Sequence, residues 1–355
     1  MTTVGANFVS TNYLANSLVG PVMQAQSRLT NAMTEMSTGE YADLGLQLGD
    51  QSGYELSLKE QVGQLQTLTT GNSAVSTSLA TAQSALSAIQ SNAQTTLNNL
   101  AAWTPSGTSG ASLDNMGRSG LQSLISGVNT TSSDQYVFGG INSAVAPMAD
   151  YYSTPASAAK TAVDQAFQTT FGVLPSDPAA ANISASDMQS FLSGPFAALF
   201  QGASWSTDWS SASSDNTSAT SAPGQTVTTS TNANQPGFQQ LAQAYTMLSE
   251  FGGSALSTDA QQAVATAASS LVSQGTDSMI NIQAGLGSSQ SAVTSANSSM
   301  SSQLIILQQQ IGNLDDVNQN TTAAQINSLT EQVQMAYELT ARLSQLNLAQ
   351  YLPVP

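Results

Sequence analysis

Hydrophobic residues recur at steps of three and four along both ends of the chain. In residues 288–352 the pattern runs from Val293 to Leu314, fades over residues 315–322 and resumes at Ile326. At about 100° per residue, the apolar side chains after Ile326 cover about 220° of the helix surface, against about 100° on an ordinary surface helix. One antiparallel partner cannot bury so broad a face. The pattern therefore predicts a helix that several neighbouring helices surround.

A matching stripe runs from Leu14 to Met36 near the N-terminus. Gly39 is expected to end this helix, because glycine adopts the left-handed conformation that follows many helix C-termini. We expect an ordered irregular loop over residues 39–55 and then a helix over residues 56–102, about 70 Å long at 1.5 Å per residue. Shorter helices are predicted over residues 113–129, 238–251 and 258–286.

The character of the chain changes after residues 136–140. Residues 141–236 are rich in proline and aromatic residues and contain a serine- and threonine-rich run. We expect helices over residues 163–171 and 187–200 and a strand over residues 226–230, so this segment reads as a small mixed domain.

The predicted fold class is mainly α. We expect an elongated helical rod of long coiled-coil-like helices, formed by the N- and C-terminal halves, with a small mixed α/β domain inserted in the middle. The expected domains are a terminal coiled-coil assembly domain (1–40 with 288–355), a helical rod domain (41–140 with 237–287) and an inserted variable domain (141–236).

Charged residues are unusually scarce. They make up 7% of the chain, against about a quarter in ordinary soluble proteins. Low-complexity disorder is one interpretation, but the 40% hydrophobic content lies in long heptads. The favoured interpretation is self-assembly, because a charge buried between copies without a partner is costly.

The charge that remains excludes several classes of protein. The net charge is −16 and the five Lys and Arg residues are scattered, which disfavours binding to nucleic acid or to an anionic membrane. No apolar run could span a bilayer, and no secretory signal stands at the N-terminus. The chain is thus expected to be cytosolic or exported by a route that reads no such signal.

Candidate catalytic groups are few. Histidine and cysteine are absent and lysine occurs twice, so only carboxylates could serve as acid–base or metal-binding groups. The only adjacent pair, Asp315 and Asp316, is interpreted as a turn signal that faces solvent. We expect no cofactor, no metal site and no enzymatic activity.

Several segments resemble the flagellin superfamily. Thr34–Gly39 resembles its E-x-S-T-G turn, Tyr136–Gly140 resembles Y-L-F-G-G, and Leu286–Gln290 with Ile311–Val317 resembles two segments of its C-terminal half. Within that family, residues 40–49 are similar to those of alphaproteobacterial hook-associated proteins. Residues 336–352 resemble the end of the hook-associated protein 3 group, which forms the hook–filament junction. Glu40 and Tyr41 depart from the pattern usual in filament proteins, which favours the junction group.

The resemblance implies a structural, non-enzymatic subunit of the bacterial flagellum, secreted through the flagellar type III channel. Its implied partners are copies of itself, neighbouring hook-associated protein and flagellin subunits, and a cytosolic export chaperone. The main alternative is a flagellin that forms the filament. A secreted hydrolase using paired carboxylates and a coiled-coil fibre with parallel chains are further alternatives.

We predict that the apolar faces of the terminal helices form the assembly interface. Its predicted residues are Leu14, Leu18, Val22, Ala25, Leu29, Met36, Leu304, Leu307, Ile311, Leu314, Ile326, Leu329, Val333, Ala336, Leu339, Leu343, Leu346 and Tyr351.

Overall fold

The computed structural model describes residues 11–105, 109–253 and 255–345, and over these residues the protein is mainly α, as predicted. The chain divides into two compact units. The terminal unit comprises Met1–Leu65 with Ser302–Pro355, and the central unit comprises Gln66–Ser301. The long helices α3 (Ser52–Ala102) and α10 (Thr258–Asp315) each contribute residues to both units.

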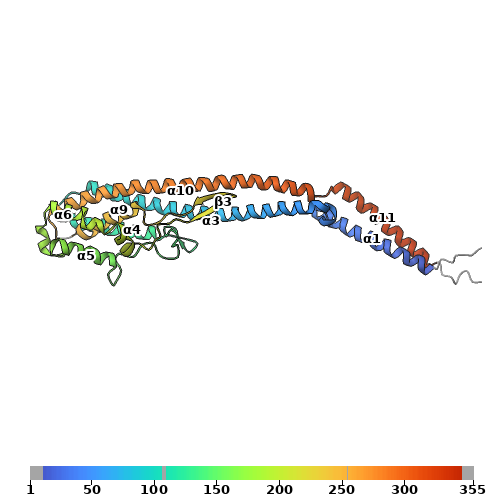
Figure 1. Ribbon diagram of the computed structural model, residues 1–355, viewed down its shortest axis with the longest axis horizontal. Helices are drawn as coiled ribbons and strands as arrows, with labels where there is room; N and C mark the ends of the chain where they lie inside the picture. The colour runs from blue at the N-terminus through green and yellow to red at the C-terminus, as the bar shows by residue number, and fades with distance from the viewer. Residues whose placement is uncertain (1–10, 106–108, 254, 346–355) are drawn as a thin grey trace, which may run out of the picture. The chain divides into compact units, whose positions relative to one another are not determined.

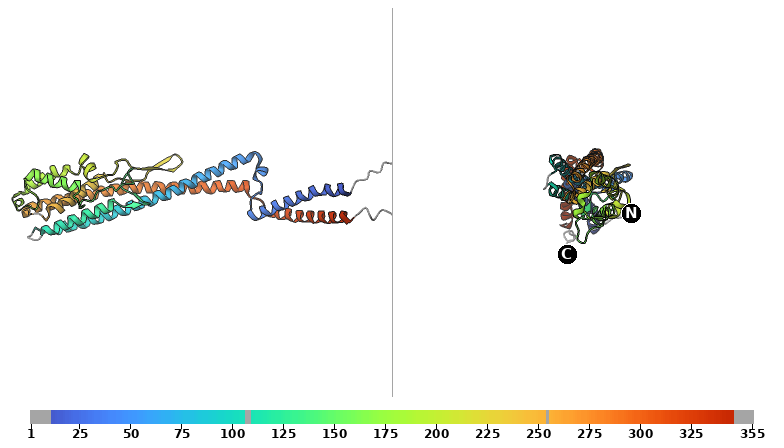
Figure 2. Two further views of the ribbon diagram at one scale, coloured as in Figure 1. Left: turned by 90° about the horizontal axis from the view of Figure 1, so that it is seen from below. Right: turned by 90° about the vertical axis from the view of Figure 1, so that its left-hand side faces the viewer.

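Two helices pair in the terminal unit. They are α1 (Thr11–Thr38) and α11 (Gln319–Gln345), which lie side by side in Figures 1 and 2. Pro21 lies inside α1, and Gly39 follows the helix with a φ of 82°. This positive φ is the left-handed conformation expected of a glycine at that position.

The loop predicted over residues 39–55 is partly helical. It contains α2 (Leu44–Leu48) and a 3₁₀ turn, η1 (Gly49–Gln51), before α3 begins. Asp43 caps α2, because its Oδ1 atom accepts a hydrogen bond of 2.9 Å from the backbone N–H of Leu46. An aspartate at this position satisfies a backbone donor that a short helix otherwise leaves unpaired.

Two of the four longest helices in the central unit, α3 and α10, lie side by side (Figure 1). The side-chain Nε2 of Gln83 on α3 donates to the backbone oxygen of Gln283 on α10 at 2.9 Å. The other two helices are α4 (Ser109–Val128) and α9 (Pro236–Phe251), close to the helices predicted over residues 113–129 and 238–251.

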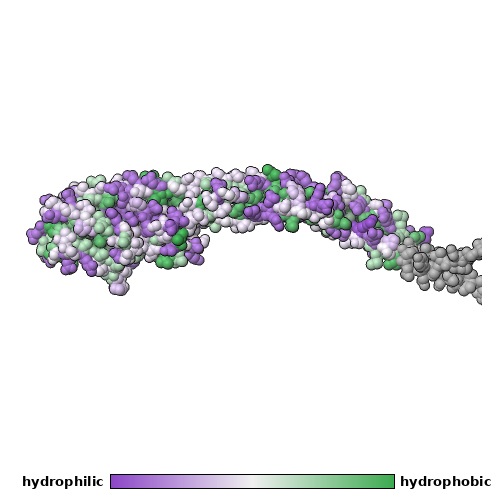
Figure 3. All heavy atoms as spheres, viewed as in Figure 1, coloured by the Kyte–Doolittle hydropathy of each residue, from purple (hydrophilic) through white to green (hydrophobic). Residues whose placement is uncertain are grey.

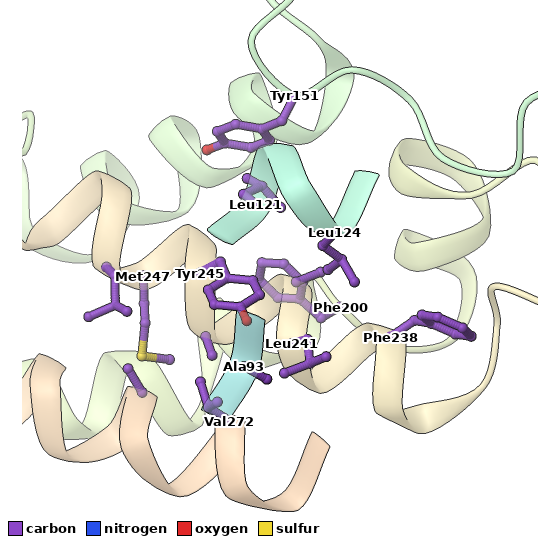
Figure 4. Close-up of a cluster of buried hydrophobic side chains, with 14 of the residues drawn as sticks. Ala93, Leu121, Leu124, Tyr151, Phe200, Phe238, Leu241, Tyr245, Met247 and Val272 are labelled. Atoms are coloured by element: carbon purple, nitrogen blue, oxygen red, sulfur yellow. The ribbon is translucent and has the colours of Figure 1, made fainter. Parts of the chain in front are cut away.

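Helix α9 is buried on nearly all sides. Leu241, Tyr245 and Met247 are at most 1% exposed, and Figure 4 shows them among side chains from the surrounding helices. Glycines let α4 approach α9 closely: a Cβ atom at Gly117 would lie 2.2 Å from the backbone nitrogen of Ser249. The lack of a side chain there is what permits the two backbones to come so near.

Residues between α4 and α9 form short elements. The helix predicted over residues 187–200 is broken at Gly194, where Pro195 starts a new turn, and the strand predicted over residues 226–230 is part of a hairpin. The elements are β1 (Thr131–Ser132), β2 (Gln135–Tyr136), α5 (Ala158–Phe171), η2 (Pro178–Asn182), α6 (Ala185–Ser193), α7 (Pro195–Ala198), α8 (Gly202–Ser204), the π-helical turn η3 (Trp205–Trp209), β3 (Ser218–Ala222) and β4 (Gln225–Thr228).

These short elements share one hydrophobic core with the long helices. Phe251, at the end of α9, stacks on Phe167 with ring centroids 5.2 Å apart. It also meets Phe191 and Phe196 edge-on at 5.6 Å and 5.4 Å. The aromatic cluster formed by residues 141–236 thus includes Phe251, which lies outside that range. The three-domain division expected from the sequence stays a prediction.

Candidate assembly surface

Helices α1 and α11 bury a narrow apolar seam between them. Ala32 on α1 is 1% exposed, and Leu329 and Val333 on α11 are 6% and 9% exposed. The side-chain amide of Gln26 donates to the hydroxyl oxygen of Tyr337 across the pair. Five more of the predicted interface residues on the pair are half-buried: Val22, Ala25, Leu29, Ile326 and Ala336. Part of the three-four pattern is therefore satisfied within one chain.

Large apolar side chains also lie on the outer faces of this pair. Met23, Met33, Met335, Tyr337 and Leu339 are between 50% and 64% exposed. Of the sixteen exposed large apolar residues in the described ranges, twelve belong to the terminal unit, which has fewer than a third of the described residues. In Figure 3, hydrophobic residues reach the surface along these helices. A concentration of this kind marks an interaction surface, whereas single exposed residues do not.

The predicted interface residues thus fall into several groups. Leu329 and Val333 are buried within the chain, while Met36 and Leu339 are 41% and 50% exposed. The α10 residues Leu304, Leu307, Ile311 and Leu314 are half-buried. Leu14, Leu18 and Leu343 lie in stretches of α1 and α11 whose side chains the structure does not describe, and Leu346 and Tyr351 lie outside the described residues.

A backbone clasp joins the two ends of the chain beside this pair. The N–H of Val317 donates to the carbonyl oxygen of Gly39 at 2.8 Å, and the N–H of Tyr41 donates to that of Asp315 at 2.9 Å. Glu40 and Asp316 form an antiparallel bridge between these bonds. The break after α1 and the break between α10 and α11 therefore lie together, held by backbone hydrogen bonds.

An ion cluster adjoins the clasp and shares Asp315 with it. The Lys59 ammonium contacts the Glu55 carboxylate and lies 2.9 Å from Oδ2 of Asp315. Asp315 is 2% exposed and Glu55 is 8% exposed, and Oδ1 of Asp315 has no hydrogen-bond partner among the described residues. Hydrogen bonds to Glu55 and then to Asp315 raise the pKa of Lys59 above its ordinary value. The expectation that Asp315 faces solvent was wrong, because its carboxylate is the buried partner of Lys59.

Two family models match the chain. The bacterial flagellin N-terminal helical region matches residues 9–143, and the bacterial flagellin C-terminal helical region matches residues 260–352. Together they cover more than half of the chain. The chain belongs to the flagellin family. No curated protein matches it.

Membership of the flagellin family identifies the chain as a structural, self-assembling subunit of the bacterial flagellum. The family is not enzymatic, and its members are extracellular components of the flagellar filament or hook. The clasp joins the two matched regions, because Gly39 and Tyr41 belong to the N-terminal match and Asp315 and Val317 to the C-terminal match. It thus connects the two parts of the chain that define the flagellin family.

Sequence reasoning missed the ion cluster of this flagellin-family chain, although one signal was available. Glu55 and Lys59 are four residues apart, in the order that favours an ion pair on a helix. The third member, Asp315, is 256 residues from Lys59. That pairing depends on how α3 meets α10 in the folded chain.

A second charge cluster lies in the central unit and is also paired. The Lys160 ammonium lies 2.5 Å from the Asp164 carboxylate and 3.1 Å from Oε2 of Glu250, and the Tyr151 hydroxyl donates to Oε1 of Glu250 at 3.0 Å. Burial raises the pKa of Glu250, and Lys160 acts in the opposite direction. Lys160, Asp164 and Glu250 line an open cleft of about 640 Å³. The carboxylates of Asp164 and Glu250 thus have structural partners, whereas the buried Oδ1 of Asp114, which lines the same cleft, has no hydrogen-bond partner among the described residues.

The described residues form neither a metal-binding cluster nor a membrane-spanning helix. No group of three acidic, histidine or cysteine side chains in the described part of the chain is arranged to hold a metal ion. Among the same residues, no helix combines the length and the apolar character needed to cross a membrane.

Proposed function

We propose that this chain is the subunit of the hook–filament junction, and that it assembles with copies of itself through the terminal unit. The observation that carries the assembly surface is the concentration of exposed apolar side chains on α1, α11 and the adjoining ends of α3 and α10. The choice of the junction rests on residues 40–49 and 336–352, which resemble those of junction proteins.

Buried and exposed apolar side chains of the terminal unit have different proposed roles. The seam of Ala32, Leu329 and Val333 holds α1 to α11 in one chain. The outward side chains Met335 and Leu339 are then free to pack on neighbouring subunits. Fully burying an exposed apolar side chain of this size contributes about 1.5–3 kcal/mol, and because Met335 and Leu339 are 61% and 50% exposed, each can contribute about half of that. Several such contacts per copy are needed to favour the assembled state, because association itself costs about 4–15 kcal/mol.

The neighbours proposed for this surface are hook-associated protein and flagellin subunits on the two sides of the junction. A cytosolic export chaperone would cover the same apolar faces before secretion, because exposed apolar patches otherwise cause aggregation. This proposal predicts that chaperone binding and assembly compete for the outward side chains of α11.

Electron microscopy of the purified chain under assembly conditions, beside a deletion strain, tests the proposal. We expect monomers or short oligomers from the chain alone, and a deletion strain that makes hooks and releases filament protein into the medium. Long filaments formed by this chain alone would instead identify it as the filament subunit, and the junction assignment would be wrong.

A matched pair of variants tests the surface itself. Leu339→Asp places a charge on the outward face of α11, where Leu339 is 50% exposed, and Ile280→Asp does the same on the central unit, where Ile280 is 49% exposed. Both should fold, because each site already faces water. Only Leu339→Asp should abolish motility and incorporation into flagella. Normal incorporation of this variant would remove the outer face of α11 from the assembly surface.

A further inference from the structure

The cleft beside Lys160 in the central unit concentrates charged side chains. Five of the eleven residues that line it are charged, in a chain where charged residues make up 7% of the sequence. Four other pockets in the described part of the central unit have no charged residue in their lining. We call this one the charged cleft. Because the chain otherwise avoids charge, this cleft is the place in the central unit that suits a charged ligand.

Two of the five charges, Asp114 and Arg118, do not pair with each other. They are four residues apart on α4, a spacing that makes side chains neighbours on a helix surface. The Arg118 guanidinium instead lies over the ring of Tyr152, 4.6 Å from its centroid, and forms no ion pair with a carboxylate of the described residues. Oδ1 of Asp114 is buried without a hydrogen-bond partner among those residues. The charged cleft thus contains one cation and one anion that the described part of the chain leaves without an ionic partner.

Each of these two groups is suited to a ligand group of opposite charge. The buried oxygen of Asp114 has lost hydration without gaining a donor, which a ligand ammonium would supply. The carboxyl group turns easily about its Cβ–Cγ bond, so either oxygen can meet a donor that enters from the cleft. A ligand carboxylate can accept two N–H groups of the Arg118 guanidinium at once. Because the ring of Tyr152 already holds that guanidinium, little of its freedom is lost on binding.

The remaining wall of the charged cleft is partly apolar. Leu174, which is 46% exposed, lines it together with Pro175 and Ala255. The volume of about 640 Å³ lies within the range of small-molecule sites, about 300–1,000 Å³. A ligand that carries an ammonium and a carboxylate therefore has room for an aliphatic group beside Leu174.

We propose that the charged cleft binds a free α-amino acid with an aliphatic side chain. Its ammonium contacts Asp114, its carboxylate contacts Arg118, and its side chain packs on Leu174. An α-amino acid carries both charges on one carbon atom, so it can reach two neighbouring side chains of one helix. A ligand with one charge would leave the other group of the cleft unpaired. The site lies in the central unit and does not depend on the proposed assembly surface of the terminal unit.

Ligand-observed saturation-transfer NMR with the full-length chain tests this site. The probes are leucine, isocaproate, which lacks the ammonium, and isoamylamine, which lacks the carboxylate. Leucine should bind at least about tenfold more tightly than either analogue, because each analogue loses one charge-assisted contact. Equal affinity for the three probes, or no saturation transfer to leucine at high millimolar concentration, would overturn the proposal.

Two variants of the cleft identify which charge contacts which group. Asp114→Asn should remove the preference for leucine over isocaproate, and Arg118→Gln should remove the preference for leucine over isoamylamine. A general loss of structure would not produce this pattern, and circular dichroism checks that both variants fold. Arg28→Gln is the matched control, because Arg28 is an exposed cation outside the cleft. Unchanged preferences in the two cleft variants, or the same change in Arg28→Gln, would refute the assignment of Asp114 and Arg118.

Discussion

Lys59 is the residue whose replacement should loosen the clasp between the chain ends. The substitution Lys59→Met keeps a straight side chain of similar length and removes only the ammonium. It leaves Glu55 and Asp315 facing each other at 8% and 2% exposure with no cation between them. Because Oδ1 of Asp315 already lacks a hydrogen-bond partner among the described residues, no spare donor within those ranges compensates for the loss.

The expected cost follows from the burial of the three groups. Removing one partner of a fully buried ion pair costs about 3–5 kcal/mol, because an uncompensated charge stays buried. The Lys59 side chain, however, is 44% exposed, so water screens its interaction with the carboxylates. We therefore expect Lys59→Met to cost the terminal unit about 1–2 kcal/mol.

Amide hydrogen exchange locates this effect. The N–H groups of Tyr41 and Val317 donate across the clasp, so their protection should fall about 5- to 30-fold for a loss of 1–2 kcal/mol. Amides of α9 in the central unit should be unchanged. Arg28→Met is the control, because Arg28 is an exposed cation of α1 in the same unit. Unaltered protection of Tyr41 and Val317 in Lys59→Met would refute the idea that the ion cluster holds the clasp.

The pH dependence of the clasp has a definite sign. The pKa of Lys59 is raised in the folded chain by its hydrogen bonds to Glu55 and Asp315. A raised lysine pKa gives stability that is fully present below the ordinary value of 10.5, and that is lost as the pH rises through the folded value. Protection at Tyr41 should thus stay constant from pH 7 to pH 9, where the exchange experiment is practical.

Three further predictions concern the central unit. The side-chain amide of Asn72, which is 1% exposed, donates to Ser221 O and to Asn297 Oδ1, both at 2.7 Å. Asn72→Ala should therefore lower the free energy of unfolding by about 1–3 kcal/mol and reduce amide protection in the β3–β4 hairpin. Unchanged protection of the hairpin would show that Asn72 does not anchor it. Gly117→Ala should lower the free energy of unfolding by about 3 kcal/mol, because backbone atoms of α9 occupy the place of a Cβ atom there. Gly71→Ala, where a Cβ atom would meet open space, should instead stabilise α3 by about 0.5–1 kcal/mol. Thermal unfolding of the two variants distinguishes these outcomes. Burial raises the pKa of Tyr245 to about 12, so the unfolded chain ionises first and stability falls from about pH 10 to pH 12. Tyr245→Phe should reduce that slope by up to about 1.4 kcal/mol per pH unit in denaturant titrations.

Long helices were the most predictable part of the fold. The heptad pattern over residues 56–102 predicted α3, which extends only four residues further at its N-terminal end. Gly39 was predicted to end α1 and does so with a positive φ. In these cases neighbouring residues contain the whole signal, because the period of apolar positions and the preference of glycine are local properties.

The division of the apolar face between seam and surface could not be predicted in the same way. The sequence places Leu329 and Leu339 in one broad face, but Leu329 is 6% exposed and Leu339 is 50% exposed. Which of them meets α1 depends on the crossing of two helices that are about 300 residues apart in the chain. Periodicity defines the face of a helix, whereas the partner determines which part of that face is covered.

Most of the lysine and arginine side chains lie at contacts within the fold. Lys59 and Lys160 each hold two carboxylates, and Arg118 lies over the ring of Tyr152 at 4.6 Å. Three of the five cations, which look scattered along the sequence, are thus placed at contacts between elements of the fold. The outward faces of α1 and α11 keep Met23, Met335 and Leu339 at the surface. The same face of α11 also exposes Glu331, Glu338 and Arg342, so contact between identical copies must pair or solvate these charges while it buries the apolar side chains.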